Sequence, residues 1–170
     1  KVISNAERTG SIKIEKRTEG MLNLSGIEFI LSGTSDSGRE ISITAVTDEN
    51  GEAIFENILV GTYTITENGE TVPVAYLVAD PTGVTVSYTE TTTVEIENKP
   101  KTGKVHITKS DVSSGALIPN CGIEILDKDG NVIFQGRTDK NGVVEFVLEC
   151  GDYFYREFDA PDGYLIDETA

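Results

Sequence analysis

The sequence is poor in several residue types on which enzymes and metal sites depend. Its 170 residues include no tryptophan, one methionine, two cysteines and a single histidine, His106. One histidine cannot build a histidine-based zinc site or catalytic triad. The sequence therefore predicts no metal site, no cofactor and no enzyme active site.

Long apolar runs and positive charge are also scarce. No run approaches the roughly 20 apolar residues that a helix needs to cross a bilayer, and the first residues lack the apolar stretch of a signal peptide. Lysine and arginine number 14 against 29 aspartates and glutamates, which gives a formal charge of -15. This excess repels nucleic acid and anionic membranes. We therefore expect neither nucleic-acid binding nor membrane insertion of these residues.

The sequence does contain an internal repeat, and self-similarity at a fixed period indicates repeated structural units. Residues 98–109 match residues 5–16 without a gap, at a spacing of about 93 residues. Further matches follow in the same order: Ser25–Phe29 with Cys121–Ile125, Thr47–Gly51 with Thr138–Gly142, and Gly61–Glu67 with Gly151–Glu157.

This register predicts the domain organisation. Residues 1–9 are assigned to the last strand and linker of a preceding repeat, and residues 10–100 to a complete domain. Residues 101–170 form a second domain that reaches no equivalent of the last strand, 93–98, of the first. We therefore expect the second domain to lack that strand.

Short runs of alternating apolar and polar residues, separated by turn residues, predict that each repeat is almost entirely β-structure. Turns such as Asn50-Gly51 and Asn141-Gly142 supply residues that tolerate positive φ in tight hairpins. The strands expected in the first repeat include 11–16, 27–31, 53–58, 63–67, 84–88 and 93–98. The fold expected is all-β, with two tandem immunoglobulin-like antiparallel β-sandwich domains.

Side-chain parity predicts three buried polar residues in the first repeat. Alternate residues of a strand share a face, so Lys16 points inward with Ile14, and Glu67 and Asn98 likewise follow apolar residues of their strands. The second repeat shows the same pattern at Lys109 and Glu157. The alternative is that these residues lie at frayed strand ends, hydrated by solvent.

Burial of such a trio would permit a covalent reaction. Desolvation lowers the pKa of a lysine and raises that of a glutamate, and a neutral amine is a nucleophile. Lys16 could then attack the carboxamide of Asn98 while Glu67 moves protons, which would expel ammonia and leave an amide cross-link.

These residues resemble the collagen-adhesin B-type (Cna B-like, prealbumin-like) domains of Gram-positive adhesins and pilins. The resemblance covers nearly the whole chain. It depends on the Lys that closes the first strand, the Thr-Asp-x-Asn-Gly turn, the Gly-x-Tyr sequence leading to Glu, and Ala160–Tyr164 in the second repeat. In the first repeat, Val72–Tyr76 departs from the expected Pro-x-Gly-Tyr sequence, which alters a turn but not the trio.

The resemblance implies prealbumin-like sandwiches and an isopeptide bond between Lys16 and Asn98, formed with the catalytic help of Glu67. In the second repeat it implies the same roles for Lys109 and Glu157, but the partner Asn is missing from the sequence. One hypothesis is that residues 1–5 of a neighbouring molecule supply the missing strand and place Asn5 beside Lys109, which would build head-to-tail chains. The alternative is a loose N-terminus.

The cysteines leave one question open. Cys121 and Cys150 permit one disulfide without demanding it, and the alternative is two small buried thiols. The repeat aligns Cys121 with Ser25 and Cys150 with Val60.

Two classes of function remain. The first is a structural stalk or spacer of a secreted or cell-wall-anchored Gram-positive surface protein or pilin, extracellular, with neighbouring repeats as its partners. The second is an adhesin domain that binds a host protein or glycan. Short loops and the absence of tryptophan favour the first.

Overall fold

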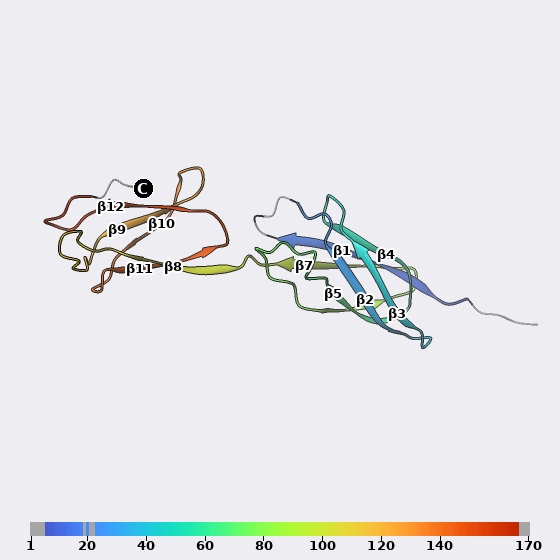
Figure 1. The fold of residues 1–170 in the computed structure, drawn as a ribbon. Helices are drawn as coiled ribbons and strands as arrows, with labels where there is room; N and C mark the ends of the chain where they lie inside the picture. Colours follow the sequence, from blue (N-terminus) through green and yellow to red (C-terminus); the bar gives the residue numbers. More distant parts are fainter. Residues whose placement is uncertain (1–5, 19, 21–22, 167–170) are drawn as a thin grey trace, which may run out of the picture. The chain divides into compact units, whose positions relative to one another are not determined.

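The computed structural model describes residues 6–18, 20 and 23–166, and every regular element in this part of the chain is a β-strand (Figure 1). The chain divides into two compact units, Lys1–Pro100 and Lys101–Ala170. The predicted all-β class with tandem sandwich domains is confirmed. Among the described residues, no helix is long and apolar enough to cross a membrane.

The first unit is a sandwich of two sheets. Its strands are β1 (Thr9–Thr18), β2 (Glu28–Ser35), β3 (Glu40–Val46), β4 (Glu52–Leu59), β5 (Gly61–Glu67), β6 (Thr82–Val86) and β7 (Thr91–Asn98). One sheet has the strand order β4-β1-β7, and the other has the order β3-β2-β5-β6.

Strand β1 illustrates how the alternating sequence produces the sandwich. Ile12 and Ile14 are fully buried, whereas Lys13 between them faces solvent and forms an ion pair with Glu52 at 2.6 Å. Because successive side chains point to opposite faces, β1 turns one apolar face toward the other sheet. The core of the unit also includes Phe29, Leu31, Phe55, Tyr63, Ile65, Val86 and Ile96.

Strands β1 and β7 run parallel, with Lys16 opposite Ile96 and Thr18 opposite Asn98. The other strand pairs in the two units are antiparallel. Because parallel strands point the same way, the C-terminal ends of β1 and β7 lie at the same end of their sheet. This one pair therefore brings the beginning of the unit's sequence beside its end.

The second unit repeats five of these strands. They are β8 (Thr102–Thr108), β9 (Gly122–Leu126), β10 (Val132–Arg137), β11 (Val143–Glu149) and β12 (Phe154–Asp159), in sheets ordered β11-β8 and β10-β9-β12. In order and pairing they correspond to β1 to β5. No counterpart of β6 or β7 occurs among the described residues 101–166. As a result Tyr155 is 58% exposed, whereas its counterpart Ile65 is 1% exposed.

The threonine of the Thr-Asp-x-Asn-Gly turn shows which residues of the two units occupy equivalent positions. Ile27 N donates a hydrogen bond to Thr47 Oγ1, and Cys121 N donates one to Thr138 Oγ1, each at 2.9 Å. Cys121 is therefore the counterpart of Ile27, and its alignment with Ser25 is wrong by two residues. The cause is the Gly-Ile-Glu triplet that the two repeats share at positions that do not correspond in space.

The possible disulfide is not present. Cys121 and Cys150 are both free thiols. Cys121 is fully buried in the core of the second unit, whereas Cys150 is exposed directly after the end of β11. One thiol faces the interior and the other faces solvent. The possible disulfide is therefore wrong, and of the two thiols only Cys121 is buried.

Candidate cross-linking site

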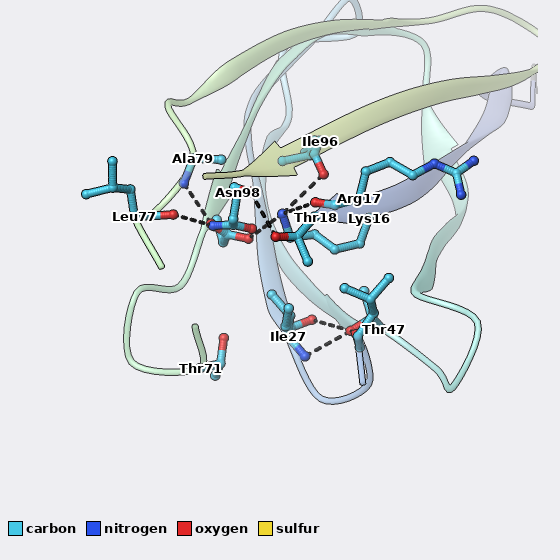
Figure 2. A network of polar contacts seen from close by, with 12 residues as sticks. Lys16, Arg17, Thr18, Ile27, Thr47, Thr71, Leu77, Ala79, Ile96 and Asn98 are labelled. Atoms are coloured by element: carbon cyan, nitrogen blue, oxygen red, sulfur yellow. Dashed lines mark hydrogen bonds and ion pairs between the residues drawn. The ribbon is translucent and has the colours of Figure 1, made fainter. Parts of the chain in front are cut away.

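Lys16 supplies an amine inside the first unit. Its side chain is 0% exposed although it lies near the end of β1. Nζ donates hydrogen bonds to Ile96 O at 3.1 Å and to Arg17 O at 3.4 Å (Figure 2). It also lies 3.3 Å from Glu67 Oε1. The contact with Ile96 comes from β7, so the parallel pairing holds the amine against the strand that ends in Asn98.

Glu67 is the last residue of β5, and its side chain is 1% exposed. Its two oxygens have different partners. Oε1 faces the Lys16 amine as an ion pair, while Oε2 accepts hydrogen bonds from Asn98 Nδ2 at 2.6 Å and from Ala79 N at 2.7 Å. The carboxyl group therefore lies between an amine and a carboxamide nitrogen.

Asn98 closes β7 and is 1% exposed. Its Nδ2 also donates to Leu77 O at 2.6 Å, and Figure 2 shows the carboxamide between the loop of Leu77 and Ala79 and the amine of Lys16. Within the described residues, Oδ1 is buried and has no hydrogen-bond partner. This carbonyl oxygen can therefore accept a hydrogen bond from a new donor without breaking an existing hydrogen bond.

The electrostatics of the site favour a reactive amine. Burial lowers the pKa of Lys16 below its ordinary value of 10.5, against the opposing attraction of Glu67. The lowered pKa increases the fraction of neutral amine, which is the nucleophilic form.

The three residues singled out from side-chain parity thus meet in one buried cluster. Sequence reasoning did not identify the backbone groups that complete it: Ile96 O, Leu77 O and Ala79 N. The last two belong to the loop after β5. In this loop, Val72–Tyr76 differs from the Pro-x-Gly-Tyr pattern of the family, but the turn is retained. Tyr76 N donates a hydrogen bond to Pro73 O, as Tyr164 N does to Pro161 O in the second unit.

The second unit contains a related but more open cluster. Lys109 Nζ lies 2.8 Å from Glu157 Oε2, and the Cys121 thiol donates a hydrogen bond to Glu157 Oε1. The Lys109 side chain is 21% exposed, and Lys109, Ile118, Glu157 and Tyr164 are among the residues that line a cavity of about 460 Å³. Asn5, the hypothetical partner of Lys109 from a neighbouring molecule, lies with all of residues 1–5 outside the described residues.

The repeated all-β sandwich architecture is that of tandem prealbumin-like domains. The family model of the SpaA prealbumin-like fold domain matches residues 10–100 and 103–170, and the chain belongs to this family. The resemblance to prealbumin-like domains is thereby confirmed.

Solved structures show which proteins the chain is similar to. The Bacillus anthracis TIE protein is 32% identical, with a TM-score of 0.78, over 95% of this chain and 30% of that one. A streptococcal ancillary pilin is 21% identical, with a TM-score of 0.46, over 95% of this chain and 57% of that one. The shaft pilin SpaA of Lactobacillus rhamnosus GG is 14% identical, with a TM-score of 0.43, over 93% of this chain and 90% of that one.

This chain therefore spans less than two thirds of the first two of these proteins. Among curated proteins, none matches the chain.

Proposed function

We propose that the chain is a structural spacer from the stalk of a Gram-positive surface protein or pilus, and that an amide bond between Lys16 and Asn98 closes its first unit. Membership of the SpaA prealbumin-like family supports the structural role. The observation that carries the cross-link is the position of Glu67, with one carboxyl oxygen at Lys16 Nζ and the other at Asn98 Nδ2.

The proposed reaction is a single transamidation. Neutral Lys16 Nζ attacks Cγ of Asn98, and a new C–N bond forms while the bond from Cγ to Nδ2 breaks. Glu67 takes a proton from the attacking nitrogen and gives one to the departing nitrogen, which leaves as ammonia. Atoms balance without any further reactant, because the products are one secondary amide and one ammonia.

Each contact in the cluster has a place in this reaction. Ile96 O holds the amine against β7, and Leu77 O holds the nitrogen that will leave. Ala79 N donates a hydrogen bond to the oxygen of Glu67 that also contacts Asn98. This hydrogen bond fixes the carboxyl group in position. Such fixed placement converts the encounter of two groups into an intramolecular step, which is a large part of the rate acceleration in intramolecular reactions.

The cross-link would give the unit resistance to pulling. Lys16 lies on the first strand of the unit and Asn98 ends the last one, and the two strands are neighbours. Tension applied along the chain would pass from β1 to β7 through the amide and leave residues 17–97 unloaded. This property suits an extracellular stalk exposed to shear and proteases. The reaction occurs once and has no external substrate, so the proposed role is structural and not enzymatic.

The second unit supports a further proposal about assembly. In the described part of the chain β8 pairs with β11 alone, and Val105 on its inward face is 38% exposed. We propose that residues 1–5 of a second copy lie along this edge, since Ile3 and Asn5 have the spacing of Ile96 and Asn98. Purified chain would then form covalent head-to-tail multimers that are lost in Asn5→Ala. A preparation that contains only monomers would contradict this proposal.

Peptide mapping tests the cross-link in the first unit. Proteolysis should release a branched peptide in which the segment around Lys16 is joined to the segment around Asn98, with the mass of both less one ammonia. Recovery of the two segments as separate linear peptides would overturn the proposal.

A further inference from the structure

The two units differ at one position beside the carboxyl group. Ile27 in the first unit and Cys121 in the second occupy corresponding places, as their hydrogen bonds to Thr47 and Thr138 show. Both side chains are buried, and each lies two residues before the residue paired with the glutamate: Phe29 pairs with Glu67, and Ile123 pairs with Glu157. An apolar side chain in one unit is therefore replaced by a hydrogen-bond donor in the other.

The thiol changes how the carboxyl group is held. In the second unit Glu157 Oε1 accepts the hydrogen bond of Cys121, and Oε2 contacts the amine of Lys109 at 2.8 Å. In the first unit Oε1 of Glu67 faces the amine of Lys16, and Oε2 takes the hydrogen bonds. In each unit one carboxyl oxygen therefore faces the amine and the other accepts hydrogen bonds, from Ala79 N and Asn98 Nδ2 in the first unit and from the Cys121 thiol in the second.

The thiol is suited to donate and unsuited to react. Burial first, and then the hydrogen bond to Glu157, raise the pKa of Cys121 to about 12. At neutral pH the group is therefore a thiol with its proton in place. A thiolate is the form that attacks electrophiles or binds metals, so neither chemistry is available here.

We propose that Cys121 is a positioning residue of the second unit's cross-linking site, where its S–H group holds Glu157 Oε1 so that Oε2 faces Lys109. The proposal rests on the proposed function, because it assigns Lys109 and Glu157 the roles of Lys16 and Glu67. It gives the second unit a means of orienting its carboxyl group that the first unit lacks. The cysteine is thereby part of the site as well as of the core of the second unit.

The S–H stretching band in the infrared tests the contact directly. Cys150→Ser removes the exposed thiol and leaves Cys121 as the only source of the band. A hydrogen bond to a carboxylate weakens the S–H bond, so the band should lie at lower frequency than in the same protein with Glu157→Gln. An identical band in the two proteins, with unchanged β-sheet amide bands, would overturn the proposal.

The ammonium signal of Lys109 tests the positioning. In ¹⁵N spectra assigned with Lys109→Arg, we expect Cys121→Ile, which installs the residue of the first unit, to speed exchange of the Lys109 ammonium protons about tenfold. Cys121→Ser keeps a donor and should stay close to the parent protein. Equal exchange in Cys121→Ile and the parent, or exchange in Cys121→Ser as fast as in Cys121→Ile, would overturn the proposal.

Failure of this proposal can be told apart from failure of the proposed function. The bond between Lys16 and Asn98 is read from the mass of the chain and involves neither Cys121 nor Glu157. A missing bond in the first unit with the expected thiol and ammonium signals would contradict the cross-link alone.

Discussion

Lys16 and Glu67 form an ion pair at 3.3 Å with side chains that are 0% and 1% exposed. Removing two charges from water is expensive, and their attraction often fails to repay that cost, so a buried ion pair is weak evidence of a stabilising role. The carboxamide of Asn98 donates a hydrogen bond to the same carboxyl group, so the ion pair is placed to take part in a reaction with Asn98. The predictions that follow separate chemistry from packing.

Glu67→Gln should abolish the cross-link. Glutamine keeps the shape of glutamate but cannot take the proton of the attacking amine, so Lys16 and Asn98 should remain unreacted in folded protein. The measurement is the intact mass of purified variant. Glu56→Gln, on the exposed face of β4, is the control and should react fully. A fully cross-linked Glu67→Gln protein would show that the carboxyl group is dispensable.

The rate of cross-linking should rise with pH on its acid side. Because burial lowers the pKa of Lys16, the neutral amine becomes available below the ordinary value of 10.5, and its fraction grows as pH rises toward the folded pKa. Chain refolded from denaturant into buffers of different pH, quenched at intervals and weighed, gives the rate. A rate that falls steadily from acid to neutral pH would be inconsistent with attack by Lys16.

The same pKa shift predicts the pH dependence of stability in Asn98→Ala, which keeps Lys16 but cannot react. A lysine with a pKa lowered by folding binds fewer protons in the folded state than in the unfolded state. Its unfavourable contribution is fully present below the folded pKa and is relieved as pH rises toward 10.5. The free energy of unfolding should therefore rise with pH across this window. Lys16→Met in the same background is the control and should remove that part of the rise.

Loss of the cross-link should destabilise the first unit by roughly 4 to 5 kcal/mol, if the loop-entropy relation for disulfides holds for this amide. Denaturant unfolding of Glu67→Gln gives one value. The double variant Lys16→Met with Glu67→Gln gives a second without a buried unpaired charge. Both proteins should show the loss, and equal stability of the parent and the double variant would count against a closed loop.

Thr47→Val should destabilise the first unit by about 1 to 3 kcal/mol, because it removes the acceptor of Ile27 N in a buried turn. Thr44→Val replaces an exposed threonine of β3 and should change stability by less than about 0.5 kcal/mol. Denaturant titration of both variants measures the difference. Similar effects of the two substitutions would show that the buried hydroxyl has no special role.

The matched residues Ile14 and Ile107 should respond differently to truncation. Ile14 is fully buried on β1, which β7 flanks in the same sheet, and Ile14→Ala should cost about 2 to 5 kcal/mol. Ile107 is only partly buried on β8, so Ile107→Ala should cost clearly less. Hydrogen exchange of β1 and β8 amides reports each unit separately. A larger loss at Ile107 would contradict the described burial.

Part of this structure follows from sequence alone because strand parity is a local property. The alternation of β1, β5 and β7 was enough to predict that Lys16, Glu67 and Asn98 point inward, and all three are buried. The all-β class followed from the same period of two and from the turn residues.

Other features depend on contacts between distant segments. The parallel pairing of β1 with β7 carries no local signature, yet it is what places Asn98 near Lys16. Leu77 O and Ala79 N are backbone groups, which any residue would supply. The sequence did not predict that Cys121 lies beside Glu157. The shared Gly-Ile-Glu triplet had shifted the alignment of the two repeats by two residues from the match that the structure shows.

The intact mass of the folded chain is the most direct test of the proposed bond between Lys16 and Asn98. The monomer fraction of the parent chain, weighed under denaturing conditions, should be lighter than its sequence mass by one ammonia. Lys16→Arg and Asn98→Ala should each show their full sequence mass. A parent chain at its full sequence mass, under conditions where the first unit is folded, would contradict the cross-link.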